Sequence, residues 1–315
     1  MILVTGATGF VGKPVLQRLL RDDKSMQVAV AVRIGGQSWP ERVLPRVTGD
    51  LEHVTDWSLA LGGVSAVVHC AARVHVMKDT EANPLTAFRV VNLVGTLNLA
   101  RQAAALGVKR FVFISSVKVN GESTSPGRAF TEADAAAPKD AYGQSKHEAE
   151  QSLRQLSADT GMEVVIIRPP LVYGPGVRAN FAALMRAVQR GWPLPLGAVH
   201  NQRSLVALDN LVDFIATCIK HPQAANQTFL VSDGHDLSTT ELVRSMAQAA
   251  RVTARLLPVP VWALQSGASL LGKGDAMQRL CANLQVDMSK ACNLLGWVPH
   301  VSVEEGLKRA LGLRD

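Results

Sequence analysis

The sequence predicts an α/β protein with a doubly wound parallel sheet and a smaller C-terminal α/β cap. Two observations predict this fold. Short, continuously apolar segments alternate with amphipathic helical segments through the first 170 residues, a pattern typical of parallel strands covered by helices on both faces. The first apolar segment also runs directly into a glycine-rich turn that opens the first helix.

The elements follow one another in a regular order. We expect strands over residues 2–5, 26–33, 66–72, 110–115 and 163–167, and helices over 13–20, 84–106 and 142–156. The alternation then loosens, and helices are expected over 180–190, 209–220 and 239–250, between segments rich in Gly and Pro. We therefore expect a sheet domain over residues 1–170, with strand contributions from about 200–232, and an interleaved substrate-binding cap over 171–315.

Composition narrows the partners and the location. No apolar run approaches the roughly 20 residues of a membrane span, and Met1 leads straight into the glycine turn, so we expect a cytoplasmic protein without stable membrane insertion. The net charge is +7, but Lys and Arg are scattered and aromatic residues make up only 5% of the chain. This favours an anionic small molecule over nucleic acid as the partner. The four cysteines lack CxxC spacing, so no metal site is expected.

The turn from Gly6 to Gly12 predicts a dinucleotide site. Its first glycine allows a tight turn, the second lets the backbone approach a pyrophosphate, and the third allows the helix to pack on the strand. The helix N-terminus then offers free N–H groups to the negative charge. We expect a Rossmann-type cofactor domain in which the turn residues bind the cofactor: Gly6, Thr8, Gly9, Phe10, Val11 and Gly12.

Arg33 bears on which dinucleotide is bound. Enzymes that use NAD usually place an acidic residue at the end of the second strand, where it binds the ribose hydroxyls. Here that strand ends in Arg33, and a guanidinium suits a ribose 2′-phosphate. We therefore expect NADP(H) to be preferred and NAD(H) to be possible; the alternative interpretation of Arg33 is an ordinary solvated side chain.

Tyr142 and Lys146 form a candidate catalytic pair. Residues four apart lie on one face of a helix, and a nearby ammonium would lower the phenol pKa from its usual value of about 10. Tyr142 could then exchange a proton with a carbonyl/alcohol pair. Ser116, at the carboxyl end of a predicted strand, is expected to hold the substrate oxygen, with Ser115 as the second choice. The competing interpretation of Ser116 is a serine that caps a turn.

These residues belong to a larger set of motifs that resembles one family along essentially the whole chain. The chain resembles the extended short-chain dehydrogenases, specifically their nucleotide-sugar epimerase, dehydratase and reductase group. The further matching pieces are Gly49-Asp50-Leu51, His69-Cys70-Ala71-Ala72, Asn92 in Val-Asn-Leu-Val-Gly-Thr, Arg168-Pro169, Val172-Tyr173-Gly174-Pro175, Arg203 in Asn-Gln-Arg-Ser-Leu-Val, Asp209-Asn210-Leu211 and Leu295-Gly296-Trp297.

The resemblance implies roles for individual positions. Asp50 and Leu51 would contact the adenine, Ala71 and Ala72 would line the pyrophosphate, and the cofactor-binding set would also include Asn92, Pro169, Val172, Tyr142 and Lys146. On the substrate side, the diphosphate of a UDP-sugar would be held by Asn180, Arg203 and Arg279, the base would lie along 193–197 with Leu196, and Ser115 would face the sugar. The helices over 84–106 and 142–156 would form a four-helix interface in a homodimer.

Departures from the family pattern direct the choice of reaction. Leu171 stands where an asparagine often contacts the substrate. Val117-Lys118 follows Ser116 where dehydratases carry Asp-Glu, so we disfavour elimination of water. With Arg33, these features favour an NADPH-dependent reductase of the 4-keto group of UDP-linked 6-deoxy-N-acetylhexosamines, as in bacterial polysaccharide synthesis. The alternatives are a UDP-hexose or UDP-N-acetylhexosamine 4-epimerase with tightly bound NAD, and a binding protein that has lost its chemistry.

Overall fold

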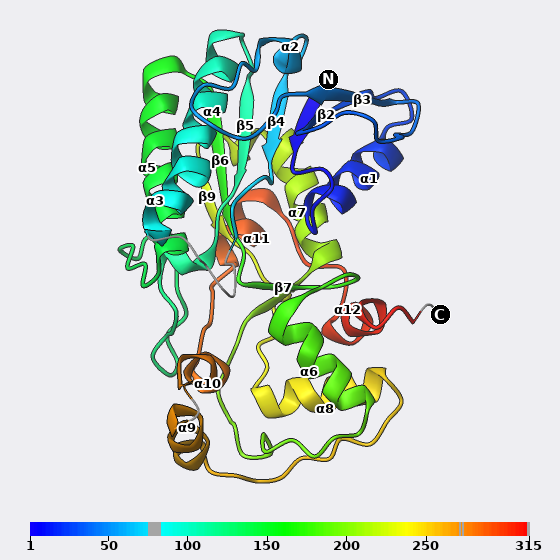
Figure 1. The fold of residues 1–315 in the computed structure, drawn as a ribbon, viewed down its shortest axis with the longest axis vertical. Coiled ribbons are helices and arrows are strands. Elements are labelled where there is room, and N and C mark those ends of the chain that lie inside the picture. Colours follow the sequence, from blue (N-terminus) through cyan, green and yellow to red (C-terminus); the bar gives the residue numbers. More distant parts are fainter. Residues whose placement is uncertain (75–82, 271, 273, 314–315) are drawn as a thin grey trace.

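A seven-stranded parallel sheet forms the upper part of the molecule in Figure 1. The computed structural model describes residues 1–74, 83–270, 272 and 274–313. The sheet strands, in spatial order, are β3 (Val43–Val47), β2 (Val28–Val32), β1 (Ile2–Thr5), β4 (Ala66–His69), β5 (Arg110–Ile114), β6 (Glu163–Arg168) and β9 (Thr228–Leu230). This confirms the Rossmann-type fold expected from the sequence.

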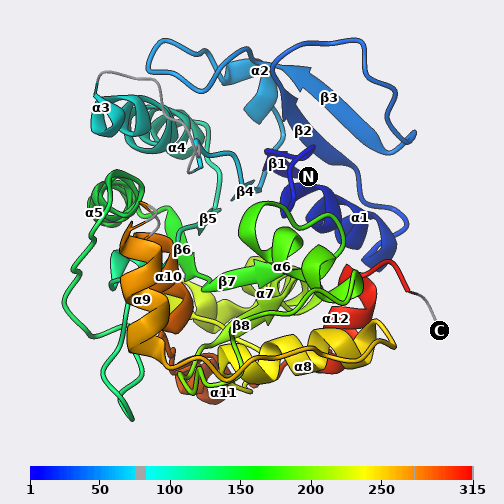
Figure 2. The same ribbon diagram turned by 60° about the horizontal axis from the view of Figure 1, so that its bottom comes forward.

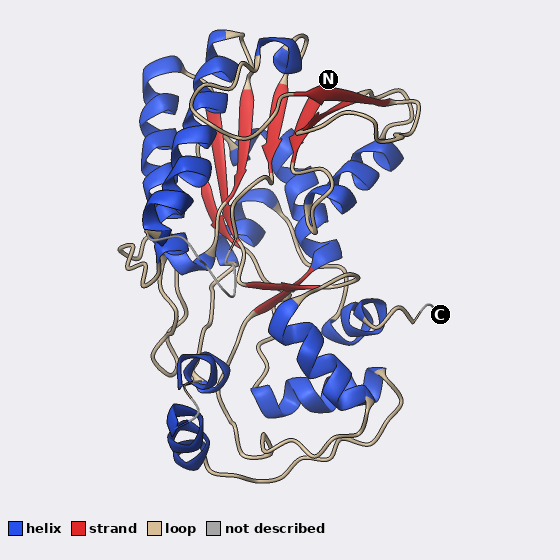
Figure 3. Ribbon diagram, in the orientation of Figure 1, coloured by secondary structure: helices blue, strands red, loops and turns tan. Residues whose placement is uncertain are grey.

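Helices cover both faces of this sheet (Figure 3). One face packs against α1 (Gly12–Asp22), α7 (Leu208–Lys220) and α11 (Ser289–Leu295). The other packs against α2 (Ser58–Leu61), α4 (Thr96–Ala105) and α5 (Ala141–Thr160). Side chains alternate between the faces, so Val4 faces the first set and Leu3 the second. Because both faces are buried, the strands are apolar at almost every position.

The helix expected over 84–106 is not uniform. It consists of α3 (Pro84–Arg89), a π-helical segment η1 (Val90–Gly95) and α4. Gly95 lies where this segment meets the loop after β3, because a Cβ on Gly95 would come within 2.5 Å of the Leu51 carbonyl oxygen. The widened turn, the kind found at functional sites, brings Asn92 to the site described below.

The part of the chain after residue 170 that does not join the sheet layer forms a smaller body below the sheet (Figures 1 and 2). Its two-stranded parallel sheet pairs β7 (Leu171–Tyr173) with β8 (Leu205–Ala207). The surrounding helices are α6 (Ala179–Gln189), α8 (Thr239–Ala249), α9 (Val261–Leu270), α10 (Gly274–Cys281) and α12 (Val303–Ala310). Short 3₁₀ turns, η2 (Val117–Val119) and η3 (Pro222–Ala224), complete the elements. The strands β3 and β7, the short α2 and the helices after residue 260 were not among the predicted elements, whereas β8 and β9 lie within the stretch of about 200–232 that was expected to contribute strands.

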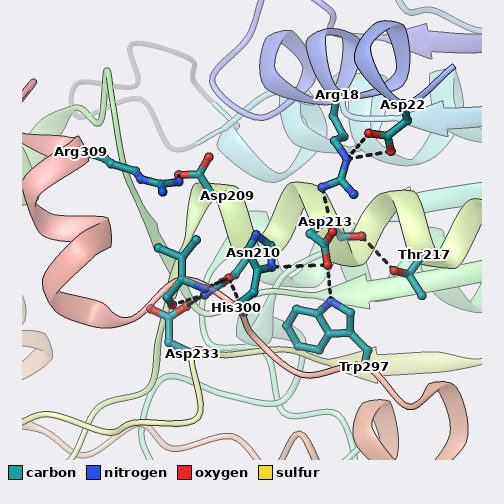
Figure 4. A network of polar contacts seen from close by, with 11 residues as sticks. Arg18, Asp22, Asp209, Asn210, Asp213, Thr217, Asp233, Trp297, His300 and Arg309 are labelled. Atoms are coloured by element: carbon teal, nitrogen blue, oxygen red, sulfur yellow. Dashed lines mark hydrogen bonds and ion pairs between the residues drawn. The ribbon is translucent and has the colours of Figure 1, made fainter. Parts of the chain in front are cut away.

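Two of the matched motifs serve the fold rather than a site (Figure 4). The Asn210 side chain on α7 accepts hydrogen bonds from the backbone N–H groups of His300 and Val301, and it donates to Asp233. The indole N–H of Trp297 donates to Asp213, also on α7, at 2.8 Å. Asp213 in turn pairs with Arg18 of α1. These contacts fasten the last 20 residues or so of the chain to the sheet helices.

Candidate functional site

The expected site residues lie at the carboxyl ends of the central strands, where ligands bind in open α/β sheets. The turn at Gly6 follows β1, Ala71 follows β4, Ser115 and Ser116 follow β5, and Pro169 follows β6. Neighbouring strands β1, β4, β5 and β6 are hydrogen-bonded side by side. The structure therefore gathers at one edge residues that are far apart in the sequence.

The glycine turn is built as tightly as its spacing predicts. Gly6 adopts a φ of +68°, and a Cβ there would come within 2.7 Å of the Ala71 nitrogen. A Cβ on Gly12 would lie 2.2 Å from the Gly6 carbonyl oxygen, so only glycine fits. The backbone N–H groups of Phe10 and Val11 make no hydrogen bond within the described residues, and they lie at the N-terminus of α1. Such groups suit an anion.

Arg33 and Asp50 lie next to each other beyond the ends of β2 and β3. The Arg33 guanidinium is 3.7 Å from the Asp50 carboxylate, and both side chains are largely exposed. An acidic group is thus present beside the end of the second strand, although it is supplied by the third. Sequence reasoning missed this pairing because it depends on β3, an unpredicted strand that pairs with β2 and brings Asp50 beside Arg33.

Asn92 holds the loop that follows β4. Its amide donates to the Arg73 carbonyl and to Ser145, and its oxygen accepts from the Arg73 N–H. His69, at the end of β4, is fully buried between the Thr5 and Thr96 hydroxyls, and burial lowers its pKa to about 3. His69 is therefore a neutral core residue.

Ser115 and Ser116 have different environments. The Ser115 hydroxyl is buried and donates to Glu150 on α5 at 2.6 Å, so its proton is already used within the protein. The Ser116 hydroxyl is part-buried and accepts from the Lys118 N–H at 3.2 Å, so it caps the 3₁₀ turn η2. That weak cap leaves the Ser116 hydroxyl proton available, because the hydroxyl acts only as an acceptor in this contact.

Tyr142 and Lys146 lie in the first two turns of α5, as their spacing predicts. Tyr142 is half-buried and meets Phe88 edge-on, with ring centroids 6.0 Å apart. Lys146 is 1% exposed; its ammonium donates to the Ile114 carbonyl at 2.8 Å and lies 4.4 Å from the centre of the Phe113 ring. The Tyr142 hydroxyl makes no hydrogen bond within the described part of the chain.

The electrostatics of this pair differ from the expectation. Burial, with the Asp140 charge, raises the pKa of Tyr142 to about 12, and burial lowers the pKa of Lys146 to about 8. The predicted lowering of the Tyr142 pKa by Lys146 is therefore wrong for this arrangement. The physical reason is that the ammonium donates to Ile114 instead of to the phenol, while both groups are taken out of water.

Lys118 and Asp140 frame the start of α5. The Lys118 ammonium pairs with Asp140 and also with Glu122, at 3.1 Å. The other Asp140 oxygen accepts from the Gly143 N–H at 2.7 Å and so caps the helix that carries Tyr142. Lys118 thus occupies the position at which dehydratases would carry an acid, and its ion pairs with Asp140 and Glu122 hold it there.

A buried ion pair stands behind the two serines. Glu150 is fully buried, and Arg168 is 3% exposed. The guanidinium of Arg168 donates twice to Glu150, at 2.9 and 2.5 Å, and once to Asn120. Because Glu150 also accepts from Ser115, this pair fixes the end of β5 relative to α5. Sequence reasoning singled out Arg168 by its motif but did not find Glu150.

The expected substrate residues are only partly brought together. The Arg203 guanidinium donates to the carbonyls of Arg279 and Ala282, which joins it to the end of α10. Its Nε and Nη2 groups have no partner within the described residues, and burial lowers its pKa. Asn180 is exposed near the start of α6, after Ala179, whose φ is +56°. Leu196 is buried, and its carbonyl accepts from the Thr240 hydroxyl.

The comparisons with known proteins agree with this arrangement. Residues 2–232 match the NAD dependent epimerase/dehydratase family. A UDP-glucose 4-epimerase from Vibrio cholerae is 53% identical over 310 residues, which cover 98% of this chain and 93% of that protein. An N-acetyl-alpha-D-glucosaminyl-diphospho-ditrans,octacis-undecaprenol 4-epimerase from Escherichia coli O157:H7 is 28% identical over 327 residues, covering 98% and 94%.

A solved structure shares the fold. The UDP-glucuronic acid 4-epimerase from Bacillus cereus, in complex with NAD, matches with a TM-score of 0.77 at 21% identity, covering 98% of this chain and 96% of that one. At this identity the likeness shows the architecture alone.

Proposed function

The chain belongs to the NAD-dependent epimerase/dehydratase family, and we propose that it is a UDP-sugar 4-epimerase that inverts C4 of a UDP-hexose or a UDP-N-acetylhexosamine. The observation that carries the proposal is the 53% identity to a UDP-glucose 4-epimerase over 98% of the chain. The epimerase, the alternative expected from the sequence, thus becomes the leading reading, and the NADPH-dependent 4-ketoreductase becomes the alternative.

The residues at the strand ends fit an NAD molecule. The free N–H groups of Phe10 and Val11 supply donors for a pyrophosphate. A Cβ on Gly9 would meet only the Gly6 carbonyl oxygen, so the outer side of this turn is open to a ligand. When bound, NAD would accept a hydride from C4 of the sugar and return it to the opposite face.

The chain supplies the proton transfer. Tyr142 takes the proton of the C4 hydroxyl as the hydride leaves, and it returns the proton to the oxygen when the hydride comes back. The Ser116 hydroxyl donates to the same oxygen. Lys146 lies one turn from the phenol, and we propose that its ammonium turns from the Ile114 carbonyl toward the phenol when the ligands bind, which would favour the phenolate. Leu171, which is 41% exposed, offers no polar group to a substrate at the position where an asparagine often makes a contact.

Asp50 supports NAD over NADP as the coenzyme. A carboxylate can accept hydrogen bonds from both ribose hydroxyls, whereas a 2′-phosphate placed on Arg33 would also lie close to the Asp50 charge. Arg33 in this arrangement is the partner of Asp50. The preference for NADP(H) expected from Arg33 is thereby replaced by a proposed preference for NAD(H).

Arg203 supports a diphosphate on the cap side. Its Nη1 group is committed to the end of α10, which leaves Nε and Nη2 for a ligand. This edge of the guanidinium can bind two oxygens side by side. Arg279, exposed on α10, lies close enough for its own carbonyl to accept from Arg203, and its side chain is proposed to join the same diphosphate.

A single assay separates the two readings. The purified protein is incubated with UDP-glucose and, separately, UDP-N-acetylglucosamine, without added coenzyme, and the products are resolved by chromatography. An epimerase forms the corresponding galacto sugar and releases NAD on denaturation. A reductase leaves both sugars unchanged and consumes NADPH only with a 4-keto sugar. Tyr142→Phe should abolish conversion while the bound NAD is retained.

We also propose that two copies associate through α3, η1 and α5. Val90 and Val94 are 40% and 39% exposed on η1, beside the ion pair of Arg89 with Glu148 that joins α3 to α5. A second copy on this face would bury both valines. Light scattering of the wild type and of Val94→Asp tests it, since a charge at the interface should yield monomers.

A further inference from the structure

Apolar side chains are exposed at the end of the molecule farthest from the seven-stranded sheet. This end is formed by the segment after α6, the segment after α8, and α9 (Figures 1 and 2). Trp192 is 54% exposed, Leu257 50%, Trp262 71% and Leu270 89%. We call these four residues and the arginines named next the distal surface.

The distal surface is cationic. Arg190, Arg251 and Arg255 are all exposed in the same segments, and the Arg190 guanidinium lies 5.4 Å from the centre of the Trp192 ring. The sequence holds no Asp or Glu from residue 164 to 208, and none from 242 to 272. The segments of the distal surface, residues 190–197 and 251–270, lie within these two stretches, so no acid of their own offsets the three arginines.

The segments of this surface are ordered by backbone hydrogen bonds. The Leu194 N–H donates to the Arg255 carbonyl, and the Leu257 N–H donates to the Leu194 carbonyl. α9 packs on the cap core through Leu264, and Ala268 is also buried, while Trp262 and Leu270 remain exposed on the same helix. The exposed apolar side chains therefore lie on an ordered surface, and other residues of the same segments make the contacts with the cap core.

We propose that the distal surface docks on the anionic headgroup layer of a lipid membrane. Tryptophan favours the membrane–water boundary, where its ring is buried and its N–H is wet. Arginine there contacts lipid phosphates while its stem lies on apolar surface. Within the described residues no helix is long and apolar enough to cross a membrane, so the contact is peripheral, like that of an interfacial helix.

Charge favours this occupant over a second copy of the chain. A two-fold contact would place the distal surface against itself, so its three arginines would face three identical arginines, and the chain segments that carry them contain no Asp or Glu. Single-stranded nucleic acid would match the charge and could stack on the tryptophans, but it would leave Leu257 and Leu270 exposed. Anionic lipid satisfies the aliphatic, aromatic and cationic groups together.

Vesicle sedimentation with the full-length protein tests the proposal. We expect the protein to sediment with vesicles of phosphatidylglycerol and phosphatidylcholine, and to remain in solution with phosphatidylcholine alone or at high salt. Trp262→Ser combined with Leu270→Ser should abolish sedimentation. Arg190→Gln combined with Arg255→Gln should weaken it by on the order of 25-fold, since each charge near an anionic surface contributes about 5-fold.

Matched variants control for general effects. Leu59→Ser removes an apolar side chain that is 82% exposed on α2, in the sheet half, and Arg21→Gln with Lys24→Gln removes two exposed charges near the end of α1. Both should sediment like the wild type, and all variants should melt like the wild type. The proposal fails if the wild type does not sediment with anionic vesicles, or if the control variants lose as much sedimentation as the distal-surface variants. It also fails if Trp262→Ser combined with Leu270→Ser yields a smaller oligomer than the wild type, or if the wild type binds a single-stranded oligonucleotide more tightly than the vesicles.

Discussion

Asp140 and Lys118 form an ion pair next to the first turn of α5, and Asp140 also caps that helix through the Gly143 N–H. One carboxylate therefore does two things for Tyr142. It fixes the start of the helix that carries the phenol, and its negative charge adds to burial in raising the pKa of Tyr142. Lys118 moderates the second effect by neutralising Asp140.

Asp140→Asn separates these two roles. Asparagine caps helices as well as aspartate does, so the fold should be retained, but the loss of negative charge should lower the Tyr142 pKa. If the phenolate is the base, the rising limb of the pH–rate profile moves to lower pH. Glu122→Gln, which removes the other partner of Lys118, is the control and should leave the profile in place. An unmoved profile in Asp140→Asn would exclude this coupling.

The depressed pKa of Lys146 predicts a dependence of stability on pH. Its pKa is about 8 in the folded protein and near 10.5 ordinarily. Between these values the unfolded chain binds a proton that the folded protein does not, so the free energy of unfolding rises with pH by up to about 1.4 kcal/mol per unit. Below pH 8 both states are protonated, and the burial penalty is fully present.

Urea unfolding at about pH 7.5 and about pH 9.5 measures this slope, because the two values lie below and above the folded-state pKa of Lys146. Lys146→Met lacks the titrating group and should show a flatter dependence than the wild type, whatever its absolute stability. Conversion of a UDP-sugar by this variant should fall by on the order of 100-fold. Parallel slopes in the two proteins would show that Lys146 keeps its ordinary pKa.

Breaking the buried pair should cost stability. Glu150→Gln leaves the Arg168 guanidinium buried without a counter-charge, which typically costs about 3–5 kcal/mol, and it weakens the Ser115 contact. Arg154→Gln removes an exposed partner of the same carboxylate and should cost about 1 kcal/mol or less. Chemical denaturation of both variants compares them, and similar losses would mean that Arg168 does not depend on Glu150.

Asp50 and Arg33 should control the choice of coenzyme in opposite directions. Asp50→Asn removes the acceptor charge for the ribose and leaves Arg33 unopposed, so NAD binding should weaken and NADP binding should strengthen. Arg33→Ala should leave NAD bound and reduce any residual binding of NADP. Titration of the apoprotein with each dinucleotide gives the ratio of the dissociation constants. Stronger binding of NADP than of NAD by the wild type would contradict the proposal.

Periodicity and motif spacing predicted the parts of the fold that local sequence controls. The strand before Gly6 and the helix that carries Tyr142 are strongly patterned, so their types and approximate bounds followed directly. β7 and β9 are three residues long, too short for a pattern to develop, and they form because partner strands already lie beside them. The π-helical segment at Asn92 likewise depends on the close approach of Gly95 to Leu51.

The sequence predicted which residues form the candidate site, but it did not predict the contacts and pKa values of those residues. Tyr142, Lys146 and Ser116 lie where the motif places them. The direction of the Tyr142 pKa was not predictable, because it depends on where the Lys146 ammonium donates. Glu150 and Asp140 carry no motif signal in a single sequence; each matters because another element brings Arg168 or Lys118 against it.

The position of β9 at the edge of the sheet has a consequence for synthesis of the chain. β9 covers the open edge of β6, and α11 and Trp297 close over it about 60 residues later in the sequence. A nascent chain therefore displays β6 as an unpaired edge until residues 228–230 have left the ribosome, and the cover from α11 follows only about 60 residues later, which leaves this edge open to aggregation in the meantime. Deletions that remove α11 and Trp297 should thus impair folding of the seven-stranded sheet, although they lie far from it in the sequence. An affinity tag is therefore better placed after the last residue of the chain than within α11 or α12.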